Sequence, residues 1–305
     1  MSGFEMRIGI DLGGTKIEAV ALGDEGEVII RRRRETPAES YADTLQAVVE
    51  LVAELEKELG QRASVGVATP GALSPHSGRI KNANSTQLIG ERLDVDLGEA
   101  LDRQIRLAND ANCFALSESV DGAARGARVV FGVILGTGVG GGIVVEGRVL
   151  TGRQAIAGEW GHNPLPWPRA SELPGPRCYC GRYGCIETFL SGPGLARDYR
   201  EGSEDLLTPK EIVRLAQTGE QRGQACLARF EHRLARGLAH VINILDPDVI
   251  VLGGGLSGIG RLYDGVPRLW QKFVFSDRVD TPLRPPVHGD SSGVRGAAWL
   301  WPKGV

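Results

Sequence analysis

MRIGIDLGGTKIEAVAL, the stretch from residue 6 to residue 22, decides the fold of this chain. An apolar strand leads into the polar glycine turn Asp11–Lys16, and a second β-rich run, Ile17–Leu22, follows at once. A P-loop or a dinucleotide-binding fingerprint would place a helix after its glycines. The stretch therefore predicts a β-hairpin whose glycine tip carries polar groups.

A second hairpin of the same kind, a strand, a glycine turn and a strand, is predicted further along the chain. Val129–Leu135 reads as a strand, residues 136–142 as a glycine turn and Ile143–Glu146 as a strand. A third buried strand, Asp248–Leu252, leads into Gly253-Gly254-Gly255. Two units that begin with matching glycine-tipped hairpins predict two duplicated α/β domains that face each other across a cleft.

The segments between the turns alternate between strand and helix. We expect a helix over residues 40–59, because its apolar residues recur at helical spacing. Ser40 is a typical capping residue at its start, and Gly60 ends it. We further expect helices over residues 97–104, 111–119, 187–200, 209–217, 225–245 and 292–300, and strands over residues 64–68 and 105–108.

Composition excludes several classes of protein. The chain has 305 residues, enough for two domains, and its 43 glycines show no collagen-like period. Five cysteines cannot form the framework of a disulfide-rich secreted protein. A net charge of −3 does not indicate a protein that binds nucleic acid or an anionic membrane through an excess of basic residues. With no signal peptide and no apolar span in view, we expect a cytoplasmic protein.

The three glycine turns form a candidate phosphate site. Backbone N–H groups of a tight glycine turn can converge on phosphate oxygens, although hairpin tips also carry glycine for local reasons. The first turn adds a hydroxyl, a cation and a strand-end carboxylate, and the third lies where α/β sheets place ligands. The candidate nucleotide-binding residues are Asp11, Gly13, Gly14, Thr15, Lys16, Gly136, Thr137, Gly138, Gly254 and Gly255.

A second cluster indicates a metal site. Cys178, Cys180 and Cys185 fall within eight residues, and clustered thiols in a reducing compartment are typical metal ligands. Cys113 and Cys226 are far away in sequence, so we expect His162 as the fourth ligand of a tetrahedral zinc ion. Four protein ligands leave no open coordination position on the zinc, so we expect it to be structural and to stabilise the proline-rich loop 162–185. The alternative is three unliganded thiols in a turn.

Together these motifs resemble the ROK family, which comprises repressors, open reading frames and sugar kinases. The resemblance rests on the motifs Asp11–Lys16, Asn109-Asp110-Ala111-Asn112, Gly136-Thr137-Gly138, Glu159-Trp160-Gly161-His162, the cysteine cluster and Val251–Gly255, in the family's order. Within the family, residues 81–86 and 288–293 look most like bacterial fructokinase (manno(fructo)kinase).

The resemblance implies an actin-like ATPase fold, with two RNase H-like α/β domains around a central cleft that binds ATP. The first two glycine turns would bind the β- and γ-phosphates, and the third would lie near the adenosine. We expect residues 1–118 with 291–305 to form the smaller domain. Residues 119–290 would form the larger one, which includes the zinc loop.

The resemblance also assigns the carboxylates. Asp110 follows a strand directly, so it is a candidate catalytic base or simply part of a helix N-cap, and the spacing alone leaves both readings open. The family match favours the base, with Asn109 beside it holding another hydroxyl. Asp11 would orient Mg²⁺, or else be an ordinary turn aspartate. Lys16 would contact phosphate or be a solvated hairpin lysine.

The sugar contacts follow from the same resemblance. In the family, the second ring nitrogen of the metal-bound histidine, here His162, donates to a sugar hydroxyl. Glu159 and Glu187 would bracket the same sugar, and Asn84 would be a further contact unless it only caps a loop.

These features lead to a functional prediction with alternatives. We expect an ATP- and Mg²⁺-dependent hexose kinase, foremost a fructokinase that forms fructose 6-phosphate and also accepts mannose. A ROK glucokinase or an N-acetylglucosamine or N-acetylmannosamine kinase is the alternative. A sugar-responsive regulator is disfavoured because the first hairpin begins at Met6, which leaves no room for a helix-turn-helix, and a silent sugar-binding protein should lack the base or a phosphate turn. We also expect a homodimer.

Overall fold

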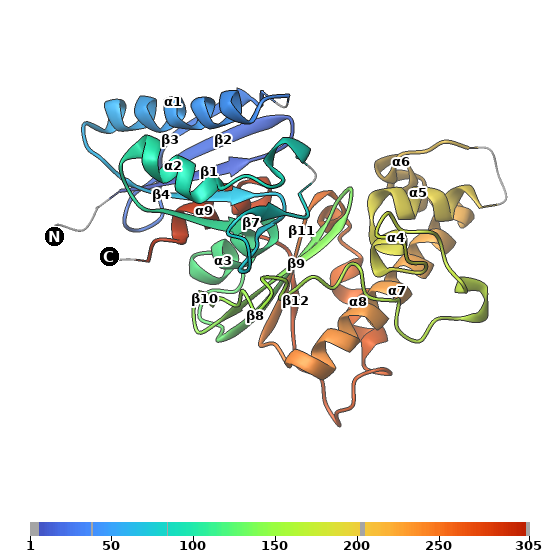
Figure 1. Cartoon of the computed structure of the whole chain (residues 1–305). Helices are drawn as coiled ribbons and strands as arrows, with labels where there is room; N and C mark the ends of the chain where they lie inside the picture. Colours follow the sequence, from blue (N-terminus) through green and yellow to red (C-terminus); the bar gives the residue numbers. More distant parts are fainter. Residues whose placement is uncertain (1–5, 38, 84, 202–204, 303–305) are drawn as a thin grey trace. The chain divides into compact units, whose positions relative to one another are not determined.

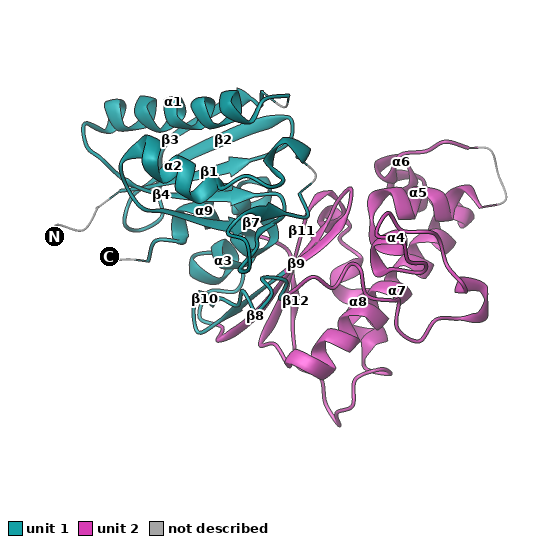
Figure 2. Ribbon diagram, viewed as in Figure 1, with its two compact units in different colours: residues 1–126, 142–157, 287–305 teal, residues 127–141, 158–286 magenta. Residues whose placement is uncertain are grey.

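The computed structural model describes residues 6–37, 39–83, 85–201 and 205–302 (Figure 1). Its contacts divide the chain into two compact units (Figure 2). Unit 1 comprises Met1–Gly126, Gly142–Ala157 and Val287–Val305, and unit 2 comprises Ala127–Gly141 and Gly158–Pro286. Compared with the expected division, residues 119–126, 142–157 and 287–290 fall in unit 1.

Unit 1 is built on a five-stranded sheet in the order β3-β2-β1-β4-β7. The hairpin β1–β2 is antiparallel as predicted, whereas β1, β4 and β7 run parallel to one another. The strands are β1 (Arg7–Leu12), β2 (Lys16–Leu22), β3 (Val28–Glu35), β4 (Ser64–Thr69) and β7 (Ile105–Asn109), with a separate small hairpin of β5 (Ala72–Leu73) and β6 (Ile80–Lys81).

The helices of unit 1 cover this sheet. They are α1 (Tyr41–Leu59), α2 (Leu93–Leu101), α3 (Asp110–Val120) and α9 (Ser292–Trp299). The predicted ends of α1 are confirmed, because the Ser40 side chain accepts the Asp43 N–H and Gly60 takes a left-handed conformation, φ 69°. In contrast, α2 begins and ends earlier than the predicted 97–104.

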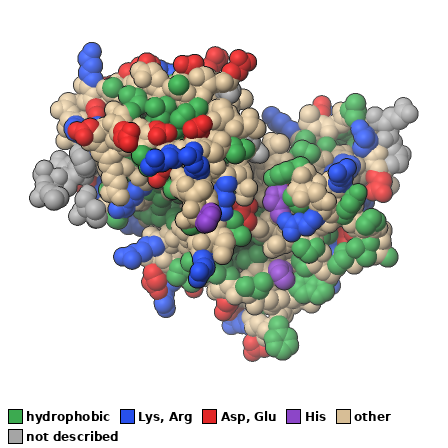
Figure 3. Space-filling model, viewed as in Figure 1, with side chains coloured by type: hydrophobic (Ala, Val, Ile, Leu, Met, Phe, Trp, Pro, Cys, Tyr) green, Lys and Arg blue, Asp and Glu red, His purple; other side chains and the backbone are tan. Residues whose placement is uncertain are grey.

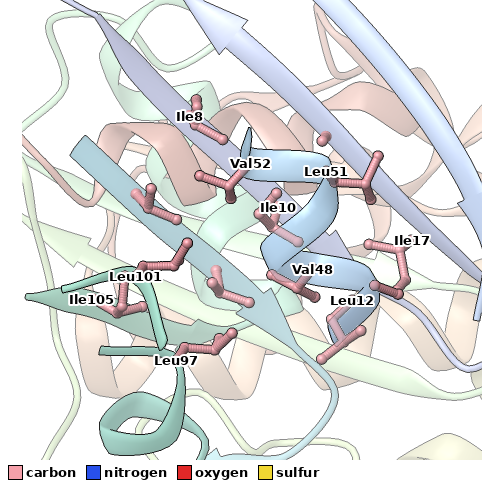
Figure 4. Close-up of a cluster of buried hydrophobic side chains, with 14 of the residues drawn as sticks. Ile8, Ile10, Leu12, Ile17, Val48, Leu51, Val52, Leu97, Leu101 and Ile105 are labelled. Carbon is pink, nitrogen blue, oxygen red and sulfur yellow. The ribbon is translucent and has the colours of Figure 1, made fainter. Parts of the chain in front are cut away.

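The core of unit 1 joins the sheet to α1 and α2. In Figure 4, Val48 and Leu51 of α1 lie against the β1 side chains, and Leu97 and Leu101 of α2 approach Ile105 of β7. Burial of such aliphatic side chains is the main stabilising term of the unit. The predicted apolar spacing of α1 therefore does supply the face that packs on the sheet.

The second sheet repeats the strand order of the first, β10-β9-β8-β11-β12. Its strands are β8 (Val129–Leu135), β9 (Val139–Val145), β10 (Arg148–Val149), β11 (Val249–Gly253) and β12 (Leu283–Arg284). The duplication predicted from the two hairpins is thus present at the level of topology. The second strand of this hairpin begins at Val139 instead of the expected Ile143, so Gly140, Gly141 and Gly142 lie in the strand.

Unit 2 carries the remaining helices, α4 (Ile186–Leu190), α5 (Gly192–Arg200), α6 (Pro209–Gln217), α7 (Gln221–Leu245) and α8 (Leu262–Trp270). The single helix predicted over 187–200 is wrong. The chain breaks at Ser191, whose side chain accepts the Gly194 N–H as the N-cap of α5, and Pro193 favours a new first turn. No helix was predicted over α8.

The arginine run Arg31–Arg34 lies on the edge strand β3, and each of its guanidiniums is paired. Arg31 and Arg33 bind Glu18 on the neighbouring strand. The other two bind carboxylates of α1: Arg32 binds Glu58, and Arg34 binds Glu50 and Glu54. Basic and acidic side chains are intermingled on the face drawn in Figure 3. The positive charges of the run are therefore balanced by carboxylates of β2 and α1.

Candidate functional site

The candidate carboxylates lie at one edge of the first sheet. Because β1, β4 and β7 are parallel, their carboxyl ends meet at the same edge. Asp11 of β1 is aligned with Ala68 of β4, and Thr69 of β4 with Asn109 of β7. The first glycine turn follows β1 at this edge and α3 follows β7, so Asp11, the turn and Asp110 are brought together.

The environment of the two aspartates raises the pKa of both. Burial raises the pKa of Asp11 to about 6, assisted by the negative charges of Asp110 and Glu18 and opposed by Lys16. Part of the Asp110 residue is exposed to solvent, yet protein atoms surround its carboxylate, and this desolvation raises its pKa. Hydrogen bonds from the backbone act in the opposite direction and lower it. Such a pair of neighbouring acids is suited to hold a cation and to accept a proton.

Both readings of Asn109-Asp110 have a structural counterpart. Asn109 is the N-cap of α3, and its side-chain oxygen accepts the Asn112 N–H at 2.8 Å. Asp110 is the first residue of the helix, and its Oδ1 accepts the Ala111 N–H at 2.8 Å. The cap thus fixes where α3 begins and holds Asp110 at the sheet edge, so capping and a catalytic role are compatible.

The first glycine turn is exposed at its tip. The Gly13 N–H donates to Lys16 O at 3.0 Å. Thr36 donates its backbone N–H to Thr15 O and its hydroxyl to Gly13 O. Gly14, Thr15 and Lys16 are exposed. The backbone N–H groups at the tip and the Lys16 ammonium are therefore placed where a ligand could reach them.

The second glycine turn is held by a different element. The Gly136 N–H closes the turn on Gly138 O, and the Gly192 N–H, at the start of α5, donates to Gly136 O at 2.8 Å. In addition, Glu187 of α4 accepts the Val139 N–H at 3.0 Å through Oε2. The predicted sugar ligand Glu187 thus also supports the predicted phosphate turn.

The second and third turns border one cavity in unit 2. The cavity has a volume of about 820 Å³ and is lined by Gly136, Thr137 and Gly255, together with residues of α5, of the start of α6 and of the segment after β11, which are mostly apolar or small but include Lys210. Position 254 requires glycine, because its φ of 77° is rarely adopted by other residues and a Cβ there would lie 2.5 Å from Leu135 O. The volume lies within the range of sites for drug-sized ligands.

The predicted metal ligands converge. One ligand atom from each of His162, Cys178, Cys180 and Cys185 lies within 4.8 Å of all the others. His162 Nδ1 is 3.5 Å from Cys178 Sγ, and Cys180 Sγ is 3.6 Å from Cys185 Sγ. Arg182 lowers the pKa of the Cys180 thiol to about 6, which favours the thiolate that binds metal. Three thiolates and an imidazole are a donor set typical of structural zinc.

The metal loop places the predicted sugar ligands near one another. Cys185 is directly followed by α4, on which Glu187 lies, and the Glu187 N–H donates to Gly161 O, next to His162, at 2.9 Å. Sequence reasoning missed Tyr179, whose hydroxyl is 2.9 Å from His162 Nε2 and whose pKa is raised in part by Glu187 and Glu159. No sequence signal points to it, because a tyrosine between two cysteines belongs to no metal-ligand or catalytic pattern.

The predicted site residues therefore fall into two sets, one in each unit. Unit 1 holds Asp11, Gly13, Gly14, Thr15, Lys16, Asn109 and Asp110. Unit 2 holds Gly136, Thr137, Gly138, Glu159, His162, Cys178, Cys180, Cys185, Glu187, Gly254 and Gly255. Asn84 lies outside the described residues. Among the helices that the structure describes, none is long and apolar enough to cross a membrane.

Comparison with known proteins agrees with this geometry. A model of the ROK family matches residues 7–304. An N-acetyl-D-glucosamine kinase of Escherichia coli O6:H1 is 41% identical over 304 residues, covering 97% of this chain and 99% of the relative. Among solved structures, a ROK hexokinase from Thermus thermophilus matches with a TM-score of 0.84 and 33% identity, over 96% of each chain. A ROK family glucokinase from Streptomyces griseus, in complex with glucose and AMPPNP, matches with a TM-score of 0.77 and 26% identity, over 97% of this chain and 98% of that one.

These matches confirm the predicted resemblance to ROK family sugar kinases and the actin-like ATPase fold that it implies. They do not support the fructokinase assignment, because the E. coli relative is an N-acetyl-D-glucosamine kinase. The segments 81–86 and 288–293, which suggested fructokinase, lie outside the glycine turns and the metal loop, and hydroxyl-binding motifs shared by many hexoses do not encode the choice of sugar.

Proposed function

The chain belongs to the ROK family as a sugar kinase, and on that premise we propose that it transfers the γ-phosphoryl group of ATP to the 6-hydroxyl of N-acetyl-D-glucosamine. The observation that carries the choice of sugar is the 41% identity, over nearly the full length of both chains, to an N-acetyl-D-glucosamine kinase. Fructose, which the sequence analysis favours, is the alternative substrate against which this proposal is tested.

The proposed roles follow the two sets of residues. In unit 2, the turn Gly136–Gly138 cradles phosphate oxygens, and the 820 Å³ cavity beyond it receives the nucleoside, near Gly255. Glu159, His162 and Glu187 bind sugar hydroxyls. In unit 1, the first glycine turn provides further N–H donors for phosphate.

Asp110 is the proposed general base. As the sugar oxygen forms its bond to the γ-phosphorus and the bond to the ADP oxygen breaks, the hydroxyl proton passes to the Asp110 carboxylate. Asp11, two strands away on the same sheet edge, would hold Mg²⁺, which supplies charge neutralisation on the phosphates. Asn109 positions a neighbouring hydroxyl.

A panel of sugars tests the proposed substrate. ADP release is measured with N-acetyl-D-glucosamine, N-acetyl-D-mannosamine, glucose, mannose and fructose at equal ATP and Mg²⁺. We expect kcat/KM for N-acetyl-D-glucosamine to exceed the others by at least about tenfold, the scale on which a shaped pocket discriminates. A lead of that size for fructose would overturn the proposal in favour of the fructokinase reading, and consumption of ATP without any hexose dependence would overturn both.

The proposed metal is a structural zinc ion at His162, Cys178, Cys180 and Cys185. Cys185→Ser removes one thiolate, so we expect loss of bound zinc and a lowered Tm, because a metal of this kind contributes folding free energy. Elemental analysis and thermal unfolding measure both effects. Cys226→Ser is the control, since Cys226 is buried elsewhere in unit 2 with its thiol on Leu195 O. Equal metal content in the two variants would contradict the assignment.

A further inference from the structure

Tyr179 makes a defined contact that packing does not explain. It stands between Cys178 and Cys180 and is 79% exposed, so burial contributes little to its position. Nevertheless its hydroxyl oxygen lies 2.9 Å from His162 Nε2, and the two rings meet edge to face with centroids 5.0 Å apart. The exposed side chain is directed back onto one atom of the metal loop.

The chemistry of His162 fixes the direction of this hydrogen bond. Nδ1 is the ring nitrogen that faces the thiols, 3.5 Å from Cys178 Sγ. A nitrogen that ligates a metal uses its lone pair, so the ring proton resides on the other nitrogen, Nε2. The Nε2–H therefore donates and the Tyr179 oxygen accepts.

The Tyr179 hydroxyl has the same hydrogen-bonding capacity as a sugar hydroxyl. A phenolic oxygen can accept one hydrogen bond while its own O–H donates another. Its oxygen lies 2.9 Å from His162 Nε2, the atom to which we assign a sugar hydroxyl. The phenol therefore lies where a bound sugar would place one of its own hydroxyls.

We propose that Tyr179 is a latch on the sugar site: in the sugar-free protein its hydroxyl occupies the acceptor position at His162 Nε2, and a sugar hydroxyl displaces it on binding. A single N–H is donated in good geometry to one acceptor, so the phenol and the sugar compete for it. The latch rests on the proposed function, because it requires His162 to bind sugar. It makes Tyr179 a residue that sets sugar affinity without taking part in phosphoryl transfer.

The latch has a consequence for sugar selection. If a sugar lacks the hydroxyl that meets His162, the Tyr179 hydroxyl stays in place and His162 Nε2–H keeps a partner. The penalty for the missing hydroxyl is then smaller than it would be without the tyrosine, because an unpaired buried donor is costly. The tyrosine thereby widens the range of sugars that the site accepts.

The first measurement is sugar binding by titration calorimetry to protein purified with its metal, whose content is verified for every variant. Tyr179→Phe removes only the hydroxyl. Tyr183→Phe is the matched control, because Tyr183 is also exposed in the metal loop but pairs its backbone with Arg177. We expect Tyr179→Phe to lower the Kd for N-acetyl-D-glucosamine roughly two- to tenfold, the net worth of one hydrogen bond, with Tyr183→Phe equal to wild type and kcat unchanged in both.

The second measurement uses monodeoxy analogues of the sugar, each lacking one ring hydroxyl. For the analogue without the hydroxyl that meets His162, wild type should bind at least as tightly as Tyr179→Phe, because only in wild type does His162 Nε2–H keep a partner. The penalty for that one hydroxyl is then larger in Tyr179→Phe, by at least the factor by which its affinity for the intact sugar is raised. A purely structural role of the tyrosine would shift all analogues alike.

The outcomes separate the two proposals. Weaker or unchanged binding of the intact sugar by Tyr179→Phe overturns the latch, and so does a uniform shift across the analogues. If wild type phosphorylates a hexose while Tyr179→Phe and Tyr183→Phe behave alike, only the latch fails. If wild type phosphorylates no hexose, the proposed function fails and the latch with it.

Discussion

The two glycine hairpins have the same local design and different surroundings. In the first, the turn after β1 closes on itself through Gly13 and Lys16 and leaves its tip exposed beside Asp11. In the second, the turn after β8 is tied to helices, by the Gly192 N–H on Gly136 O and by Glu187 on the Val139 N–H. The first turn has acids of its own sheet as neighbours, whereas the second depends on the loop that carries the metal ligands.

The two sheets thus share their strand order and their glycine turn, and they differ in the elements attached to each sheet. The first sheet edge gathers Asp11 and Asp110, which suits proton and cation chemistry. The second gathers Glu187, His162 and the cysteine cluster, which suits substrate binding. Variants that act on one hairpin and spare the other test this difference.

The largest effect is expected at Asp110. Asp110→Asn removes the proposed base, so we expect kcat to fall by roughly 10²–10⁴-fold, the contribution typical of general base catalysis, while sugar binding is retained. Turnover by coupled assay and binding by calorimetry measure the two quantities. Asp102→Asn is the control on the same unit, because Asp102 has φ 50°, a conformation that asparagine accepts. A loss below about tenfold would remove Asp110 from the role of base.

A smaller effect is expected on the titration of Asp11. Its pKa is raised to about 6, chiefly by burial and then by Asp110, so the carboxyl is neutral below pH 6 and ionised above it. Since the native pKa exceeds the unfolded one, the stabilisation from the neutral form is fully present below the ordinary pKa of 3.8 and is lost as the pH rises from there through 6. Carboxyl NMR should show a midpoint near 6 that moves down in Asp110→Asn. A midpoint near the ordinary value of 3.8 would contradict the raised pKa, and a midpoint that does not move in Asp110→Asn would contradict the coupling to Asp110.

The smallest effect compares the two turns directly. A Cβ on Gly138 would lie 2.6 Å from Glu187 Oε2 and must displace it, whereas a Cβ on Gly14 would lie 3.3 Å from Ser85 Oγ. We expect Gly138→Ala to lower the free energy of unfolding by about 1 kcal/mol, the net worth of one hydrogen bond, and Gly14→Ala to lower it less. Urea unfolding measures both. Equal losses would mean that Glu187 does not support the second turn.

Sequence patterns predicted the elements whose causes are local. The hairpins follow from glycine turns between β-rich runs, and α1 follows from apolar spacing with Ser40 and Gly60 at its ends. The break at Ser191 is also encoded locally, by a capping residue with Pro193 two positions later, but helical spacing alone does not reveal it.

Other features depended on contacts between distant segments. Gly141 and Gly142 look like turn residues, yet both lie in β9. A Cβ on Gly141 would meet Gly158 O at 2.7 Å, and one on Gly142 would meet Ala111 O at 2.3 Å. The glycines are there because other backbone passes close to the strand, and no pattern within the strand reports this.

The candidate site divides in the same way. The candidate metal ligands and the glycine turns can be predicted from the sequence, because cysteine spacing and turn composition are properties of a short piece of chain. That Asp11 and Asp110 share one sheet edge, that Glu187 accepts the Val139 N–H and that Tyr179 contacts His162 follows from the tertiary structure alone. Strand pairing and loop closure bring such residues together, and they depend on the packing of whole elements, which single positions in a sequence do not express.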